Sequence, residues 1–113
     1  MTRSAREVFD DHLARRLAGK VDEDIASNYS PHVVLLTGHG VFRGHDGVRE
    51  CASRLEREMP HAELRYIRRL VDGEIAFLEW SARSGERRVE DGADTFYIRD
   101  GRILVQTVHY TVT

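Results

Sequence analysis

The sequence has little cysteine and little proline, and it has no long hydrophobic run. Its 113 residues include one cysteine, Cys51, and two prolines, so no disulfide can staple the chain and its stability must come from packing. No apolar stretch approaches the roughly 20 residues of a membrane span, and no secretory signal opens the chain. We therefore expect a cytoplasmic protein with no membrane partner.

An excess of one charge is also absent. Seventeen Lys and Arg residues against nineteen Asp and Glu residues give a net charge of −2, and neither sign forms a long run, which argues against a nucleic-acid partner. Hydrophobic residues make up 41% of the chain and charged residues 32%, enough for a core beneath a solvated surface. Domains usually hold about 100 to 200 residues, so residues 1–113 are expected to form a single domain without a separate cofactor domain. We expect no cofactor.

Hydrophobic periodicity predicts three helices. The first is expected over about residues 4–18, with capping-box spacing at its start and a glycine after its end. A shorter second helix is expected to begin at Asp22 as its cap, to carry Tyr29 on its apolar face, and to end before Pro31. The third is expected over about residues 46–59.

Runs rich in β-branched and aromatic residues predict a sheet. Short strands are expected over residues 33–37 and 41–43, before the third helix. Four longer strands follow residue 62, separated by three hairpin signals: Asp72-Gly73, Ser84-Gly85-Glu86 and Asp100-Gly101. The fold class is therefore α+β, with three N-terminal helices packed on one face of an antiparallel sheet.

Hairpin turns determine which side chains share a face of the sheet. Two-residue loops at Asp72-Gly73 and Gly85-Glu86 would pair Tyr66 with Glu79 and Phe77 with Asp94. One mostly apolar face then holds two carboxylates, and its expected members are Leu64, Tyr66, Leu70, Ile75, Phe77, Glu79, Asp94, Phe96 and Ile98.

The register after the last hairpin stays open. A two-residue loop would place Val105, Thr107 and His109 beside Asp94. A longer loop with a glycine bulge would place Gln106, Val108 and Tyr110 there instead.

The second face of the predicted sheet is also apolar, and its expected members are Ile67, Leu78, Trp80, Ala82, Val89, Asp91, Ala93 and Tyr97. Helices can cover only one side, and a lone antiparallel sheet usually alternates apolar and polar side chains. We therefore expect a homodimer formed through the sheet face.

Four side chains are candidates for acid/base chemistry. Asp94 is the strongest, because a carboxyl on an apolar face has its pKa raised by desolvation and can donate a proton; the alternative is a structural aspartate. His12 lies on the apolar stripe of the first helix and suits proton transfer, or is a structural histidine. Glu79 could share the task or pair with Arg68. His109 depends on the open register.

A metal site is not expected. His39 and His45 lie six residues apart around glycine-rich turns, and no third ligand follows at a recognised zinc spacing. Cys51 lies on the core face of the third predicted helix, where a small buried hydrophobic residue is the expected role.

Four segments, in their order and spacing, resemble the nuclear-transport-factor-2-like superfamily, specifically its SnoaL-like branch, which includes polyketide cyclases and is related to ketosteroid isomerase. The resemblance covers nearly the whole chain. The segments that carry it are Leu17-Ala18-Gly19, Tyr29-Ser30-Pro31, residues 40–49 and residues 94–103.

The resemblance implies a cone formed by a strongly curved sheet and the helices, with a mostly apolar pocket for a small organic ligand. Asp94 resembles the protonated aspartic acid of the oxyanion hole of ketosteroid isomerase, and His12 is similar in position to its tyrosine. Thr37 stands near the position of the general-base aspartate, so steroid isomerisation by that mechanism is not implied. The expected ligand-binding residues are Tyr29, Thr37, Tyr66, Phe77, Phe96 and Gln106.

Two functions remain open from the sequence. The first is cofactor-independent acid/base chemistry on a small apolar organic molecule, such as isomerisation, cyclisation or dehydration, with Asp94 as acid and His12, Glu79 or His109 assisting. The second is a non-catalytic module that binds a small ligand or assembles through its sheet.

Overall fold

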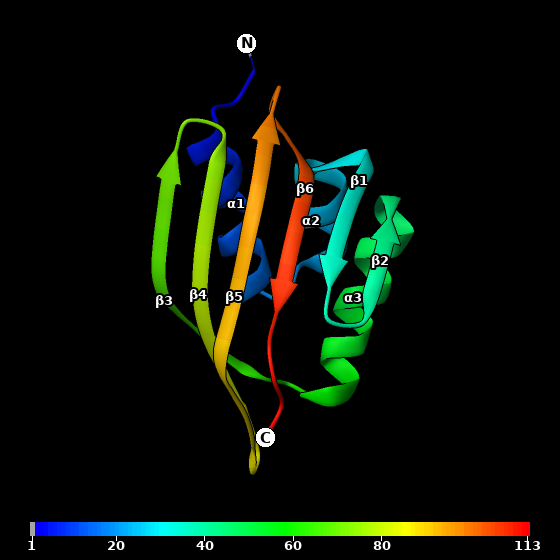
Figure 1. Cartoon of the computed structure of the whole chain (residues 1–113), viewed down its shortest axis with the longest axis vertical. Helices are drawn as coiled ribbons and strands as arrows, with labels where there is room; N and C mark the ends of the chain where they lie inside the picture. The colour runs from blue at the N-terminus through cyan, green and yellow to red at the C-terminus, as the bar shows by residue number, and fades with distance from the viewer. Residues whose placement is uncertain (1) are drawn as a thin grey trace.

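Three helices and six strands make up the computed structural model, which describes residues 2–113 (Figure 1). In chain order they are α1 (Ala5–Leu17), α2 (Val21–Asn28), β1 (Tyr29–Thr37), β2 (Gly40–Arg43), α3 (Gly44–Glu58), β3 (Glu63–Asp72), β4 (Ile75–Ser84), β5 (Arg87–Arg99) and β6 (Arg102–His109).

The helix signals of the sequence are largely confirmed. In the capping box of α1, the Glu7 amide donates to Ser4 Oγ at 3.1 Å and the Ser4 amide donates to Glu7 Oε1 at 2.9 Å. Two details at α2 were wrong. Asp22 lies in the first turn rather than at the cap, and the chain turns extended at Tyr29, which begins β1. The short helix ends there, and from Tyr29 onward the chain pairs with β6 as β1.

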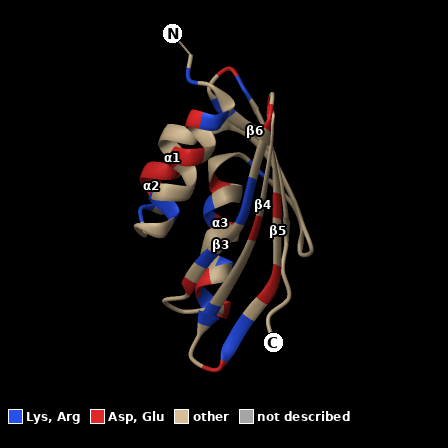
Figure 2. Cartoon of the chain, turned by 90° about the vertical axis from the view of Figure 1, so that its left-hand side faces the viewer, with Lys and Arg blue, Asp and Glu red and all other residues tan. Residues whose placement is uncertain are grey.

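The six strands form one sheet in the order β2-β1-β6-β5-β4-β3. Neighbouring strands are antiparallel except β1 and β6, which are parallel, so the predicted all-antiparallel sheet is corrected to a mixed one. The sheet curves around the helices without closing, with β2 and β3 as its edges, and the helices lie on its concave side (Figure 2). α3 follows β2 in the chain, so only α1 and α2 precede the sheet.

A bulge between β4 and β5 changes which residues face the helices. The Gly85-Glu86 loop is as predicted, because Ser84 pairs with Arg87, but the register shifts between Trp80 and Ala82. Beyond the shift Asp94 pairs with Leu78 instead of Phe77. Since side chains alternate with a period of two, this single extra residue moves the later partners to the opposite face.

The β3–β4 hairpin also differs from the prediction. Its two-residue loop is Gly73-Glu74, because Asp72 pairs with Ile75. A second shift, between Tyr66 and Arg68, places Tyr66 opposite Trp80 rather than opposite Glu79. Tyr66 and Trp80 therefore share the concave face.

The register of β6, which the sequence left open, combines features of both alternatives. Asp100-Gly101 is a two-residue loop, because Arg99 pairs with Arg102, yet a bulge follows and Phe96 pairs with Gln106. Gln106, Val108 and Tyr110 consequently lie on the side of Asp94, and His109 points away.

The concave side holds the core. Its largest fully buried side chains are Tyr29, Phe9, Phe96, Leu13, Ile25, Leu35 and Met59. Four residues predicted for the outer face, Leu78, Trp80, Ala82 and Val89, are buried here instead, because the extra residue of β5 between Val89 and Gly92 brings Asp94 onto the same face as these four. Within residues 2–113, none of the helices is long and apolar enough to cross a membrane.

Candidate functional site

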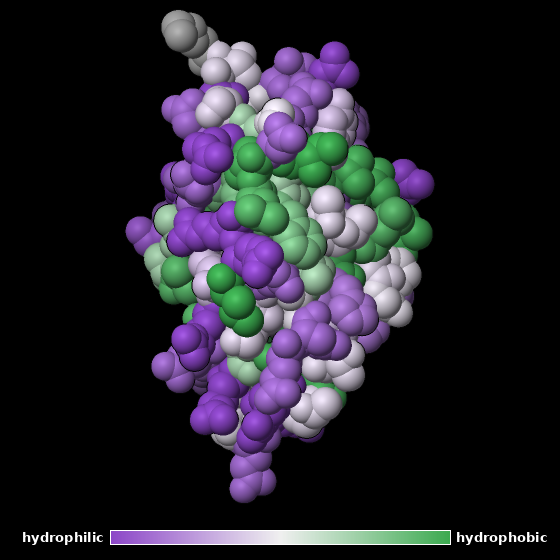
Figure 3. Space-filling view, turned by 60° about the vertical axis from the view of Figure 1, so that its left-hand side comes forward, coloured by the Kyte–Doolittle hydropathy of each residue, from purple (hydrophilic) through white to green (hydrophobic). Residues whose placement is uncertain are grey.

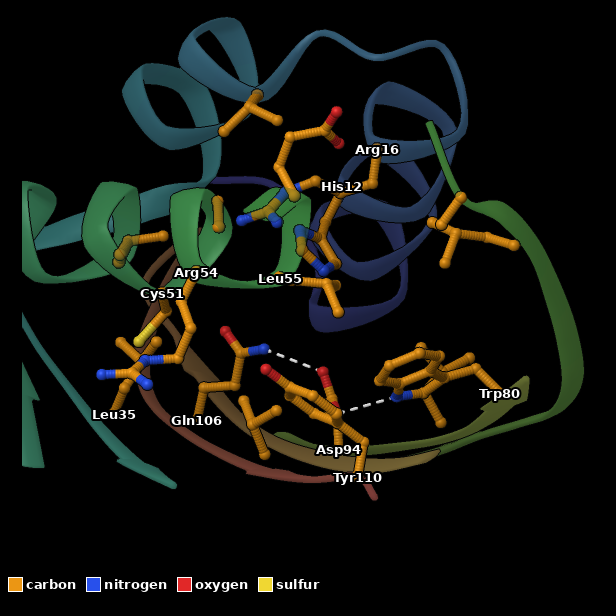
Figure 4. Close-up of a pocket in the computed structure, with 18 of the residues that line it drawn as sticks. His12, Arg16, Leu35, Cys51, Arg54, Leu55, Trp80, Asp94, Gln106 and Tyr110 are labelled. Carbon is orange, nitrogen blue, oxygen red and sulfur yellow. Dashed lines mark hydrogen bonds between the residues drawn. The ribbon is translucent and has the colours of Figure 1, made fainter. Parts of the chain in front are cut away.

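A cavity of about 420 Å³ lies between the helices and the concave face of the sheet. Residues of all three helices and all six strands line it, and part of this lining is drawn in Figure 4. Gly19 and His61 belong to its rim, and the His61 side chain is 96% exposed, so the cavity is open to solvent. Most of the lining is apolar, and a few polar groups project into it, which is the usual character of a small-molecule site.

Asp94, on β5, is the buried carboxyl at the sheet wall of the cavity. Its side chain accepts two neutral hydrogen bonds, from Trp80 Nε1 to Oδ1 and from Gln106 Nε2 to Oδ2, each 3.0 Å long (Figure 4). Burial raises the pKa of Asp94 to about 6, although both hydrogen bonds oppose the rise. Both protonation states are therefore accessible near neutral pH, as a proton-transferring group requires.

Gly92 makes room for Trp80. The two residues are paired across β4 and β5, and a Cβ atom at Gly92 would lie 2.3 Å from the indole ring. No side chain fits there, so the glycine lets the indole lie flat on the neighbouring strand. This packing holds Trp80 Nε1 within hydrogen-bond distance of Asp94.

A directed chain of hydrogen bonds joins Arg16 to Asp94. Arg16 can only donate, and it reaches the hydroxyl of Tyr29 at 3.5 Å. Tyr29 therefore donates to Gln106 Oε1, at 2.5 Å, and the Gln106 amide nitrogen must face Asp94. This order fixes the orientation of the Gln106 amide. Gln106 is thereby oriented to donate to Asp94. When Asp94 is protonated, its own O–H stays available to donate to another group.

His12, on α1, faces the cavity from the helix wall (Figure 4). Its Nδ1 lies 2.8 Å from Asp24 Oδ2, and Asp24 is fully buried on α2. Burial lowers the pKa of His12, although the bond to Asp24 opposes this, so the imidazole is neutral at pH 7. With Nδ1 donating to the carboxylate, Nε2 carries the free lone pair, which has no partner among residues 2–113 and is not sealed from the cavity.

Asp24 stays ionised because three donors surround it. Burial opposes its ionisation, but His12, Arg16 and Asn28 outweigh burial and lower its pKa. Arg16 Nε donates to Oδ2 at 2.6 Å, and Asn28 Nδ2 donates to Oδ1 at 2.8 Å. An aspartate that accepts from the Nδ1–H of a histidine orients the ring and stabilises it when it takes a proton.

Six residues predicted for the site line the cavity, namely Asp94, His12, Tyr29, Thr37, Tyr66 and Gln106. The others lie elsewhere. Glu79 and Phe77 are on the convex face, where Glu79 Oε1 is 3.1 Å from Arg68 Nε, so the ion pair that the sequence offered as the alternative is present. His109 is exposed and lies 3.3 Å from Asp91. Phe96 is fully buried beneath His12, outside the lining.

Four polar residues of the site were missed in the sequence, namely Asp24, Arg16, Trp80 and Arg54. A signal existed for Arg54, which shares with Leu55 the stripe that faces the core from α3. Asp24 gave little signal, because its contact with His12 depends on how two helices pack. Within residues 2–113, no group of three or more His, Cys, Asp or Glu side chains could hold a metal ion.

This curved sheet, its three helices and the cavity between them define a nuclear-transport-factor-2-like fold. The sequence profile of the SnoaL-like domain matches residues 5–106, and the chain belongs to that family. No curated protein matches the sequence.

Many solved structures share the fold, and three of them show the degree of similarity. An NTF-2 like protein of unknown function from Burkholderia xenovorans is 17% identical, with a TM-score of 0.75 and coverage of 95% of this chain and 82% of its own. A protein from Kribbella flavida, provisionally named a ketosteroid isomerase, is 19% identical, with a TM-score of 0.77 and coverage of 98% and 82%. A provisionally named polyketide cyclase from Sinorhizobium meliloti is 16% identical, with a TM-score of 0.74 and coverage of 90% and 93%.

Proposed function

We propose that this protein binds a small, largely apolar organic molecule in the cavity and catalyses cofactor-independent acid/base chemistry on it. The observation that carries the proposal is that one solvent-reachable cavity brings Asp94 and His12 together from opposite walls (Figure 4). Two titratable groups in different environments are the usual means of dividing acid and base roles. The names of the similar structures, a ketosteroid isomerase and a polyketide cyclase, are consistent with this chemistry.

The environments of the two groups assign their roles. His12 Nε2 is the proton acceptor, because Asp24 holds Nδ1–H and stabilises the imidazolium that forms. Asp94 is the proton donor, because burial raises its pKa to about 6 and its protonated form can donate to a carbonyl oxygen. In an enolisation, the proton on the α-carbon moves to His12, the proton of Asp94 moves to the oxygen, and an enol forms. Isomerisation, cyclisation and dehydration can each begin with this step.

Proton exchange in a model ketone tests the proposal. 2-Tetralone is a bicyclic ketone small enough for the cavity, and NMR in D₂O follows the replacement of its α-protons. We expect the protein to accelerate the exchange. His12→Gln and Asp94→Asn should each reduce the protein-catalysed rate by about 100-fold or more, the usual contribution of one acid or base.

Two variants serve as matched controls. His109→Gln and Glu79→Gln remove an imidazole and a carboxylate that lie outside the cavity, and both should exchange at the rate of the unchanged protein. If 2-tetralone binds but its protons exchange no faster than in buffer, catalysis is contradicted. The non-catalytic binding module would then be the better description.

We also propose that the protein is a homodimer through the convex face of its sheet. Large apolar side chains remain exposed there, including Ile67 at 62%, Leu70 at 54% and Ile75 at 57%, with Phe77 and Tyr97 half-buried nearby. Figure 3, in which the side that carries β3 comes forward, has hydrophobic patches between hydrophilic side chains in its upper half. Exposed apolar clusters of this kind are typical of protein interfaces.

Sedimentation velocity tests the dimer directly. We expect a species of twice 13.0 kDa, converted to the monomer by Ile75→Arg. Leu17→Arg places the same charge at a similarly exposed leucine on α1, 54% exposed, and should leave the dimer intact. A single 13.0 kDa species for the unchanged protein would refute the dimer.

A further inference from the structure

Arg54 is a charged side chain of the cavity lining that the proposed acid/base pair does not use and that forms no ion pair within residues 2–113. It lies on α3, on the stripe with Cys51 and Leu55, and its side chain reaches into the cavity (Figure 4). Its Nε is buried and has no hydrogen-bond partner among residues 2–113. Leaving a buried donor of a charged group unpaired is costly.

The two carboxylates one helical turn from Arg54, Glu50 and Glu58, form no ion pair with it. Glu58 lies one helical turn further on, but its Oε1 accepts the hydroxyl of Tyr110 at 2.7 Å. None of the ion pairs within residues 2–113 includes Arg54. Arg16, the other arginine of the cavity, differs because Asp24 neutralises it at 2.6 Å. Arg54 is therefore the cationic side chain of the lining that has no ion-pair partner within residues 2–113, whereas the lining carboxylate Glu56 lies 3.9 Å from His61 Nδ1.

We infer that the natural ligand is an apolar carboxylic acid, whose carboxylate binds Arg54 while its apolar body lies against the sheet wall and its reacting end meets Asp94. The inference rests on the proposed function and adds the substrate class to it. A guanidinium fork matches the two oxygens of a carboxylate. A monoanion is favoured over a dianion, because a single cation is unpaired and Asp94 can itself become negative.

The placement of the groups suits one ligand that touches both ends. In the view of Figure 4, Gln106 lies between Arg54 and Asp94 along the sheet wall. Leu35, also in the lining, contributes apolar surface near Arg54. A cavity of about 420 Å³ accommodates a carboxylate, a ring or short chain, and a second polar group.

A matched pair of probes tests the charge preference. 3-Cyclohexylpropionate and 3-cyclohexylpropanamide have nearly the same shape and differ in charge, and neither absorbs where tryptophan does. Trp80 is the only tryptophan of the sequence and lines the cavity, so its fluorescence reports binding. At pH 7 we expect the unchanged protein to bind the carboxylate at least tenfold more tightly than the amide.

Arg54→Met should remove that preference, so that both probes bind with the affinity of the amide. Arg57→Met is the matched control, because Arg57 lies on the same helix with its side chain exposed, and it should keep the preference. Since Arg54→Met removes an unpaired buried donor, its urea midpoint should be unchanged or higher, which separates a loss of binding from a loss of folding.

The outcomes distinguish the two proposals. Equal affinity of the unchanged protein for both probes, or a preference that survives in Arg54→Met, would overturn the carboxylate inference and leave a cavity for neutral apolar molecules. Failure of the unchanged protein to bind either probe would count against the proposed function itself, and the inference would fall with it.

Discussion

Asp24 and Asp94 are both buried, yet their pKa values move in opposite directions. Asp24 is fully buried on α2 and has a lowered pKa, whereas Asp94 is 9% exposed on β5 and has a pKa raised to about 6. Burial opposes ionisation at both sites. The difference lies in the partners: a guanidinium, an imidazole and an amide surround Asp24, while Asp94 has an indole and an amide.

The comparison explains how one small cavity can hold an acid and a base. Removing a carboxyl from water makes it a weaker acid unless a nearby cation compensates. Asp24 has that cation in Arg16 and stays ionised, which suits it to orient His12. Asp94 lacks a direct cation and keeps a proton accessible near neutral pH.

The largest expected effect is the loss of the Asp24 charge. Asp24→Asn would leave Arg16 and His12 without their shared anion, and breaking a buried ion pair from one side typically costs about 3–5 kcal/mol. We expect urea unfolding at pH 7 to show a loss of this size. Asp22→Asn is the matched control: it lies on the same helix with its side chain 83% exposed, so it should cost no more than about 1 kcal/mol. Equal losses in both variants would break the contrast between the two buried aspartates.

The pH dependence of stability should separate Asp94 from Asp24. The raised pKa of Asp94 means that the folded state holds its proton more tightly, so this group adds stability as pH falls from about 6 toward 3.8. The contribution of Asp24 to stability depends on pH in the opposite sense. Because its pKa is lowered in the folded state, Asp24 stabilises the protein at pH values above its pKa in the unfolded chain, and this stability is lost in stronger acid.

Urea unfolding of the unchanged protein and of Asp94→Asn, at pH 7.5 and at pH 4.5, measures the Asp94 contribution. At about 1.4 kcal/mol for each pH unit between about 6 and 4.5, the unchanged protein should gain about 2 kcal/mol relative to the variant. The variant is needed because the lowered pKa of His12 acts in the opposite sense over this range. A difference between the two proteins that is the same at both pH values would contradict the raised pKa.

The smallest expected effect concerns the donor that Gln106 supplies. Gln106→Leu removes a hydrogen bond that lowers the pKa of Asp94, so the pKa should rise by about one further unit. Trp80 donates to the same carboxyl, and the pH midpoint of its fluorescence should move upward accordingly. The transition should vanish in Asp94→Asn, and Thr107→Val, a change at a neighbour on the convex face, should leave the midpoint in place. A fluorescence midpoint that moves to lower pH in Gln106→Leu would contradict the role of Gln106 as a donor to Asp94.

Local signals in the sequence predicted the elements well. The capping box at Ser4, the loop at Gly85-Glu86 and the loop at Asp100-Gly101 are all present, because each depends on a few adjacent residues. The faces of the strands were predicted less well. Bulges at Trp80 and near Tyr97 each add one residue to a strand. Because side chains alternate between the two faces, the residues beyond each bulge lie on the face opposite to the predicted one.

Part of the site followed from the same local reasoning. Asp94 was identified as a carboxyl on an apolar face, and His12 as a polar group on an apolar helix stripe, and both line the cavity. A register without bulges predicted Glu79, Phe77 and His109 on the same face as Asp94. The bulges of the actual sheet place these three side chains outside the cavity. Asp24 could not be matched to His12, because nothing local sets the distance between α1 and α2.

The sequence by itself determined the α+β class, the order of helices and hairpins, and the presence of a buried acid in β5. These properties depend on periodicity, capping and turn residues, which act over a few positions. Only the tertiary structure decided that Asp24 orients His12, that Gln106 rather than His109 meets Asp94, and that Arg54 Nε is buried without a hydrogen-bond partner among residues 2–113. Those contacts join residues far apart in the chain, and helix packing and strand bulges alone set their distances.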